Sequence, residues 1–141
     1  MKSIRHTKLY AEVIKELNYS FGDVFILDGY VISEFKEGEV ITWENHAKLM
    51  TEDVSSFLGT FGNDLRYISH RIHSYTVVAA DWSKFYKNSY SLNGYAVVSY
   101  NNKNLNFLFE SLFFALKIKR FSNLEDAIDW AKQSNFVVQK K

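Results

Sequence analysis

The feature that most constrains this chain is the alternation of helix patterns with strand patterns over its last two-thirds. From residue 42 onward, stretches with apolar residues at every third or fourth position are followed by short runs of β-branched and aromatic residues. Strands that alternate with helices favour right-handed crossover units and a mostly parallel sheet. The sequence therefore predicts an α/β fold, and its 141 residues fit one domain that spans residues 1–141.

The opening third of the chain has a different pattern. Apolar residues alternate with charged ones from Leu9 to Leu17, the run Val24–Leu27 is wholly apolar, and Asp28-Gly29 is a strong hairpin signal before Tyr30–Phe35. These segments predict an antiparallel β-meander. The expected fold is a mixed, mostly parallel sheet in which this N-terminal meander is followed by βαβαβα units.

The boundaries of the later elements follow from capping and periodicity. Thr42 is expected to cap the first helix, Asn101 or Asn102 a helix with an apolar stripe from Leu105 to Leu116, and Ser122 with Glu125 the last helix. The predicted helices cover about 42–58, 79–88, 102–116 and 122–134, with strands at 67–73, 95–100 and 117–121. Residues 1–7 are expected to form a flexible arm, and 135–141 a tail that is either packed or a short last strand.

Composition excludes several classes of function. The formal net charge of +1 gives no electrostatic footprint for nucleic acid, and the absence of cysteine excludes disulfides and thiolate zinc sites. There is no apolar run of the roughly 20 residues that a transmembrane helix needs, and the N-terminus lacks the apolar core of a signal peptide. We therefore expect a cytoplasmic protein. The aromatic content of 17% fits either a filled core or a surface for self-association.

The segment Tyr67–Thr76 reads as a central strand, yet it is unusually polar. We expect His70 and Arg71 to belong to a buried structural network, with Arg71 paired to Asp53 or Glu52. Because side chains alternate along a strand, His70 and His73 would point to opposite faces, so no metal site is predicted. No cofactor is expected either.

The carboxyl ends of two neighbouring strands carry the candidate site. Ligands of open α/β sheets lie beyond the carboxyl ends of parallel strands. The residues expected there are His73, Ser74, Tyr75, Thr76, Tyr100 and Asn101. Ordinary helix capping explains Asn101 equally well. The nucleophile elbow G-x-S-x-G and a glycine-rich phosphate loop are both absent from the sequence, so a non-catalytic role is favoured over an enzyme.

The order and lengths of these segments resemble the SpoIIAA-like superfamily, which comprises the STAS domains and the related Sec14-like lipid-binding fold. The similar segments are Val31–Glu34, Ile41–Glu44, Tyr67–Arg71, Tyr95–Ser99 and Leu124–Trp130. The resemblance is to small, stand-alone bacterial members of unknown role. It implies a phosphorylated serine at a turn before a helix, which would correspond to Ser74. The aspartate that precedes this serine in the family, and the glycine that follows, are missing here.

Three functions therefore stay open. The first is a cytosolic interaction or regulatory module that binds another protein or itself as a homodimer. The second is a carrier of a small apolar ligand or lipid, with a pocket between the sheet and the Leu105–Leu116 helix. An enclosed apolar cavity would favour the carrier, whereas a filled core with a flat aromatic face would favour the interaction module. A third hypothesis is a hydrolase or transferase that uses His70 or His73.

Overall fold

The strands form a mixed sheet that follows the order of the chain. The computed structural model describes residues 2–100 and 106–139, and within them the main sheet has six strands. They are β1 (Lys15–Tyr19), β2 (Gly22–Leu27), β3 (Tyr30–Phe35), β5 (Arg66–Arg71), β7 (Gly94–Ser99) and β8 (Lys119–Phe121). The first three are antiparallel neighbours, and β3, β5, β7 and β8 are parallel. The predicted α/β class, with a mixed sheet and an N-terminal meander, is confirmed.

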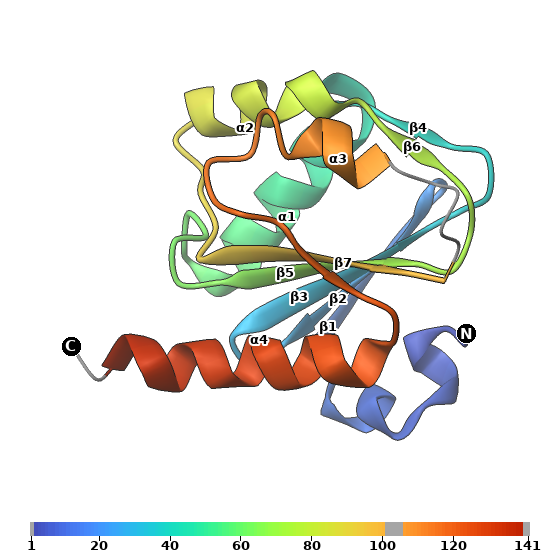
Figure 1. Ribbon diagram of the computed structural model, residues 1–141, viewed down its shortest axis with the longest axis vertical. Coiled ribbons are helices and arrows are strands. Elements are labelled where there is room, and N and C mark those ends of the chain that lie inside the picture. Colours follow the sequence, from blue (N-terminus) through green and yellow to red (C-terminus); the bar gives the residue numbers. More distant parts are fainter. Residues whose placement is uncertain (1, 101–105, 140–141) are drawn as a thin grey trace.

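Helices cover both faces of this sheet (Figure 1). One face, here called the α1 face, carries η3 (Trp43–Ala47), α1 (Lys48–Leu58), η4 (Ala79–Asp81), α2 (Trp82–Lys87) and α3 (Asn106–Glu110). The opposite face, here called the α4 face, carries η1 (Ile4–His6), η2 (Lys8–Glu12) and α4 (Leu124–Gln139). A separate two-stranded ribbon pairs β4 (Val40–Ile41) with β6 (Thr76–Val77) at one end of the α1 face. Because the parallel strands follow one another in order, all their connections lie on the α1 face.

Capping residues fix the ends of the long helices. The hydroxyl oxygen of Thr42 accepts a hydrogen bond from the backbone N–H of Asn45 at 3.2 Å, as predicted, and the helix begins there with the π-helical turn η3. Gly59 ends α1 with φ 69°, a left-handed conformation that suits glycine. The cap of α4 is Asn123, whose side-chain oxygen accepts from Asp126 N at 2.9 Å. The prediction that Ser122 caps this helix was one residue too early.

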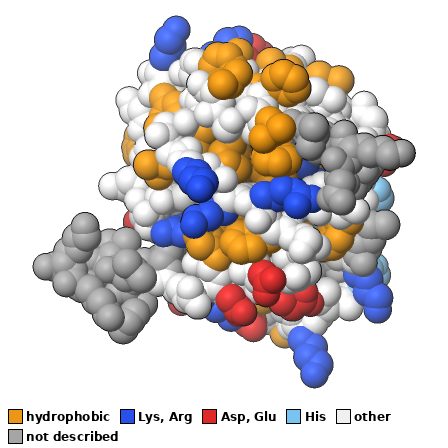
Figure 2. All heavy atoms as spheres, viewed as in Figure 1, with side chains coloured by type: hydrophobic (Ala, Val, Ile, Leu, Met, Phe, Trp, Pro, Cys, Tyr) orange, Lys and Arg blue, Asp and Glu red, His pale blue; other side chains and the backbone are white. Residues whose placement is uncertain are grey.

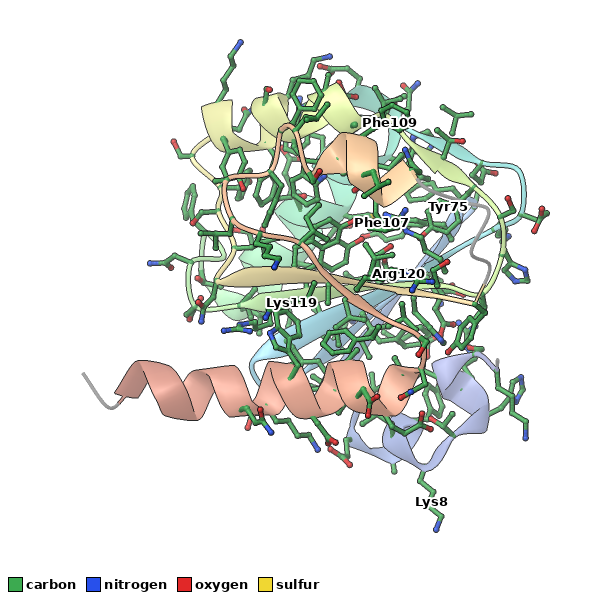
Figure 3. All side chains as sticks on the ribbon, viewed as in Figure 1. Lys8, Tyr75, Phe107, Phe109, Lys119 and Arg120 are labelled. Atoms are coloured by element: carbon green, nitrogen blue, oxygen red, sulfur yellow. The ribbon has the colours of Figure 1, made fainter. Side chains whose placement is uncertain are left out.

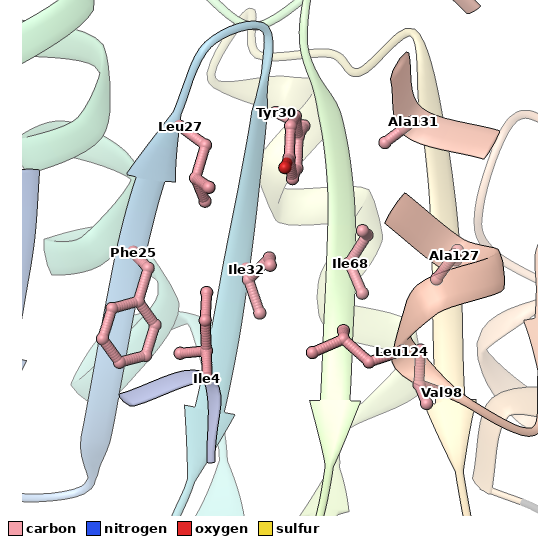
Figure 4. Close-up of a cluster of buried hydrophobic side chains, with 11 residues drawn as sticks. Ile4, Phe25, Leu27, Tyr30, Ile32, Ile68, Val98, Leu124, Ala127 and Ala131 are labelled. Atoms are coloured by element: carbon pink, nitrogen blue, oxygen red, sulfur yellow. The ribbon is translucent and has the colours of Figure 1, made fainter. Parts of the chain in front are cut away.

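The core of the α4 face is aliphatic and closely packed (Figure 4). Its buried members are Ile4, Phe25, Leu27, Tyr30, Ile32, Ile68, Ala96, Val98, Leu124, Ala127 and Ala131. Ala127 and Ala131 place small side chains on the inner side of α4, so the helix backbone comes close to the strands. Ile4 is completely buried in this cluster. The prediction that residues 1–7 form a flexible arm is therefore wrong from Ser3 onward.

Two other expectations near the ends of the chain are corrected. The alternating pattern from Leu9 was read as a strand, but Lys8–Glu12 forms the 3-10 helix η2, and pairing with β2 is limited to β1, Lys15–Tyr19. The tail predicted from residue 135 continues α4, which runs to Gln139. In both places a short alternating or apolar run was compatible with either structure.

The predicted helix with a stripe from Leu105 to Leu116 is much shorter in the structure. Only Asn106–Glu110 is helical, and the first residues of the prediction lie outside the described part of the chain. Beyond Glu110 the chain turns and runs to the edge strand β8. Much of the apolar stripe is consequently exposed: Leu112 by 74%, Phe109 by 62%, and Leu108, Leu116 and Phe113 by 40–49%.

Candidate functional site

Strand β5 is the centre of the candidate site, because its side chains reach both faces of the sheet. Tyr67, Ser69 and Arg71 lie on the α1 face, whereas Ile68 and His70 lie on the α4 face. This alternation agrees with the one expected from the sequence. The two faces hold separate hydrogen-bonded networks.

The network on the α1 face joins Arg71 to α3. Arg71 Nη2 donates to Glu110 Oε2 at 2.5 Å and to Tyr95 Oη at 2.9 Å. Glu110 Oε1 accepts from Tyr95 Oη at 2.7 Å and from Trp82 Nε1 at 3.1 Å. Since Glu110 is completely buried, these four donors replace the water that its carboxylate loses. The network therefore fastens α3 to the sheet and to α2.

Burial and neighbouring charges shift the ionisation of this network. Burial alone would lower the pKa of Arg71, but the phenols of Tyr95 and Tyr75 and the carboxylate of Glu110 raise it well above its ordinary value. Burial first, and then the Glu110 carboxylate, raise the pKa of Tyr95 well above 10. Arg71 is thus a permanent cation beside a neutral phenol at neutral pH.

A second branch of the network extends across the sheet. Arg71 Nε donates to Ser69 Oγ at 3.0 Å, and Ser69 Oγ lies 2.8 Å from Tyr75 Oη. The guanidinium also lies over the Tyr75 ring, 5.4 Å from its centroid. Tyr67 stacks on Tyr95 with ring centroids 5.1 Å apart and an interplanar angle of 8°. These contacts hold a row of aromatic side chains rigidly against the sheet.

The predicted partner of Arg71 is a correction. Asp53 accepts from Tyr19 Oη at 2.6 Å, Glu52 is exposed on α1, and Arg71 binds Glu110 instead. Glu110 was missed, although the sequence carries a signal for it. It is the single charged residue between Lys103 and Lys117, in an otherwise apolar or uncharged run. A lone acid in such a run indicates a buried carboxylate with a basic partner.

The network on the α4 face is built around His70. Its Nδ1 lies 2.8 Å from Glu34 Oε2, and its Nε2 lies 2.7 Å from Tyr100 Oη. Glu34 also accepts from Ser3 Oγ at 2.6 Å and from the backbone N–H of Ile4 at 2.8 Å. A carboxylate on Nδ1 orients the ring so that the neutral imidazole accepts the Tyr100 hydroxyl at Nε2. This network fastens the N-terminal segment to the sheet.

The structure separates the residues that were predicted to meet at the carboxyl edge. His73, Ser74 and Thr76 are exposed, whereas Tyr75 turns inward to Ser69 and Tyr100 points to His70. Asn101 lies outside the described residues. Of the described candidates, the three exposed ones therefore form a surface loop, and the other two belong to the two interior networks.

Ser74 has little around it that would hold a phosphate. Its backbone N–H donates to the carboxylate of Glu37 at 2.8 Å, and Nδ1 of His73 lies 4.0 Å from the same carboxylate. The residues after Ser74 enter strand β6, and the next helical turn begins only at Ala79. A phosphate on Ser74 would meet the Glu37 carboxylate, and no helix N-terminus is adjacent.

An apolar pocket of about 130 Å³ lies between the sheet and the helices of the α1 face. Its walls come from η3, α1, the loop after α1, α2 and strands β2, β3, β5 and β7. Trp43, Met50, Val54, Leu65, Trp82 and Tyr90 are representative of its lining. The pocket was expected beside the Leu105–Leu116 segment, but its helical wall is α1 and α2. Tyr67, Trp82 and Tyr95 line it as well and connect it to the Arg71 network.

The exposed apolar segment of the α1 face lies beside a row of cations. Figure 2 shows hydrophobic side chains over the helices of this face, with lysine and arginine side chains next to them. Figure 3 shows Phe109 on the outer side of α3, whereas Phe107 lies on the side toward the sheet, and Lys119 and Arg120 extend from β8. The predicted edge strand thus carries its cations where a further strand would otherwise pair.

Two searches of the described residues bear on other classes of site. No three His, Asp or Glu side chains gather in a group that could hold a metal ion. No helix in this part of the chain is long and apolar enough to cross a membrane.

No protein-family model, curated protein or solved structure matches this chain. The SpoIIAA-like resemblance therefore stays an expectation drawn from the sequence, and the function is argued from the geometry of the pocket and its surroundings.

Proposed function

We propose that this chain binds a small apolar ligand in the pocket between the sheet, α1 and α2. The observation that supports the proposal is an apolar pocket of about 130 Å³ in a fold whose opposite face is filled by side chains. Binding pockets are mostly apolar and concave, with a few polar groups at defined places. A dry cavity of roughly 150 Å³ is large enough to bind benzene. The fitting ligand is therefore a single ring or a short aliphatic chain.

The walls of the pocket support specific binding because they are held in place. Trp82 donates its indole N–H to Glu110, and Tyr95 is fixed between Arg71 and Glu110. Trp43 donates its backbone N–H to Asp81 at 2.8 Å. A pocket with fixed walls loses little conformational entropy when a ligand enters. The notebook of hydrogen bonds around the rings thus favours a preformed site over an incidental packing gap.

The proposal is tested by filling the pocket. Ala47 lines it from η3, so Ala47→Phe is expected to occupy the space of a ligand. The matched control is Ala11→Phe, because Ala11 is exposed in η2 on the α4 face. Calorimetric titration with toluene should show saturable binding to the wild type and to Ala11→Phe, and none to Ala47→Phe. Absence of binding to the folded wild type, or equal binding to Ala47→Phe, would refute the proposal.

A second candidate function is self-association through the exposed α3 segment. Leu108, Phe109, Leu112, Phe113 and Leu116 give this face a group of large apolar side chains, which in soluble proteins marks an interaction surface. A second copy of the chain is the proposed partner, since a net charge of +1 offers little overall repulsion between copies.

Sedimentation equilibrium at micromolar concentration tests this second candidate. The wild type should form dimers, and Phe109→Ser combined with Leu112→Ser should be monomeric. The control combines Leu49→Ser with Phe57→Ser, which are comparably exposed on α1. A monomeric wild type would exclude self-association at that concentration.

A further inference from the structure

Asp81 gives the pocket one charged group. Of the described residues that line the pocket, Asp81 is the only one with a formal charge. It lies in η4, directly before α2, and 17% of its side chain is exposed. An ionised carboxylate beside an apolar pocket is costly unless something compensates it.

The protein itself compensates Asp81 only in part. Its Oδ2 accepts the backbone N–H of Trp43 at 2.8 Å, and its Oδ1 lies 3.4 Å from Lys84 Nζ. A carboxylate offers about four acceptor positions. Lys84 is half exposed, and exposed ion pairs of this kind contribute little. Asp81 therefore keeps acceptor capacity for a further donor.

The rings next to Asp81 favour a cation over a neutral donor. Trp43 and Trp82 both line the pocket and both pack edge-on against Phe85, with centroids 6.3 Å and 5.2 Å away. The faces of indole rings attract cations, most strongly where water is excluded. A carboxylate and aromatic rings around one apolar pocket together suit a compact organic cation.

We infer that the ligand of this pocket is an aromatic amine, with its ring between α1 and the sheet and its ammonium group at Asp81. This inference rests on the proposed function, because it requires that the pocket binds a ligand. It adds the chemical class of that ligand. The ammonium donates to the free acceptor positions of Asp81, and its remaining charge faces the rings of Trp43 and Trp82.

The experiment compares two ligands of nearly the same shape. Benzylamine is protonated at pH 7, and ethylbenzene has a methyl group in place of the ammonium. Calorimetric titration gives the ratio of their affinities for each protein. Asp81→Asn keeps an oxygen that can accept from Trp43 and removes the charge, so the ratio should shift against benzylamine by roughly tenfold. Asp129→Asn is the control, because Asp129 is an exposed acid on α4.

A second variant keeps the test decisive if Asp81→Asn does not fold. Lys84→Ala removes the cation that competes for Asp81, so it should strengthen benzylamine binding and leave ethylbenzene binding unchanged. An unchanged affinity ratio in both variants would overturn the inference. If ethylbenzene binds and benzylamine does not, the pocket binds apolar ligands but the amine assignment is wrong. If neither ligand binds, the proposed function falls with it.

Discussion

The two faces of the sheet are built from the same strands but pack in opposite ways. On the α4 face, aliphatic side chains meet the small residues Ala127 and Ala131, and the helix lies close to the strands. On the α1 face, Trp82, Tyr95 and Phe114 meet edge to face or tilted, with centroids about 5 Å apart. Small and aliphatic side chains fill space evenly, whereas fixed rings leave gaps. The comparison explains why the pocket is on the α1 face.

Neighbouring residues of β5 fasten the two faces differently. Arg71 binds α3 through Glu110, and His70 binds the N-terminal segment through Glu34 and Ser3. The first network contains a full ion pair, and the second joins a carboxylate to an imidazole and a backbone amide. The four experiments below test this difference, beginning with the largest expected effect.

Removing Glu110 should break the α1 face. Glu110→Ala leaves the Arg71 cation buried without its partner, which typically costs about 3–5 kcal/mol of unfolding free energy. Urea unfolding at pH 7 measures the loss. Glu125→Ala is the control, because Glu125 is exposed in the first turn of α4 and should change stability by less than about 0.5 kcal/mol. A loss below about 1 kcal/mol for Glu110→Ala would mean that Arg71 is not held as described.

Removing Glu34 should loosen the α4 face by a smaller amount. Glu34→Ala takes the acceptor from His70, Ser3 and the amide of Ile4, and we expect a loss of about 2–3 kcal/mol. Because the two networks lie on opposite faces, the losses from Glu34→Ala and Glu110→Ala should add within about 0.5 kcal/mol in the double variant. Strong non-additivity in urea unfolding would show that the faces are coupled through β5.

Alkaline pH should weaken both faces through their tyrosines. Burial, and then the carboxylates of Glu12 and Asp28, raise the pKa of Tyr30 from 10 to about 12. A group whose pKa is higher in the folded state stabilises fully below pH 10, and this contribution is lost as pH rises toward 12. Tyr30 alone should account for about 2 kcal/mol of that loss.

The Tyr30→Phe variant isolates this contribution. The Tyr30 hydroxyl is buried without a hydrogen-bond partner among the described residues, so the variant should be as stable as the wild type at pH 7. Its stability should fall less steeply above pH 10. Parallel curves for the two proteins in urea unfolding between pH 9 and pH 12 would contradict this account.

The smallest effect is expected beyond the end of β5. Ser74→Ala removes an exposed hydroxyl and keeps the backbone N–H that donates to Glu37, so stability should change by less than about 0.5 kcal/mol. Thermal unfolding of the variant beside the wild type is sufficient. A larger loss would show that the loop is part of the interior network.

The fold was largely predictable because its signals are local. The Asp28-Gly29 turn, the Thr42 cap and the left-handed Gly59 depend on a few adjacent residues, and each lies where the sequence places it. The meander and the alternation of strands with helices follow from hydrophobic periodicity. Element boundaries such as that of α4 depend on which of two adjacent polar residues bonds the helix, and periodicity does not decide that.

The candidate site was less predictable because its partners are far apart in sequence. Arg71 and Glu110 are separated by 39 residues, and His70 and Glu34 by 36. The polar character of the strand was visible, but a pattern does not say which carboxylate a strand residue meets. The apolar stripe around Leu112 was misread since exposed and buried apolar runs look alike in a sequence. The pocket depends on how rings pack in three dimensions.

The two networks of β5 also protect the alignment of the sheet. Ile68 faces the aliphatic cluster and Tyr67 the aromatic one, with His70 and Arg71 following in the same alternation. A shift of β5 by one residue against β3 would exchange every one of these side chains between the faces. Arg71 would enter the aliphatic core, and Ile68 would face the rings. The polar residues that looked out of place in a central strand thus give the chain one pairing register and penalise its nearest misfolded alternative.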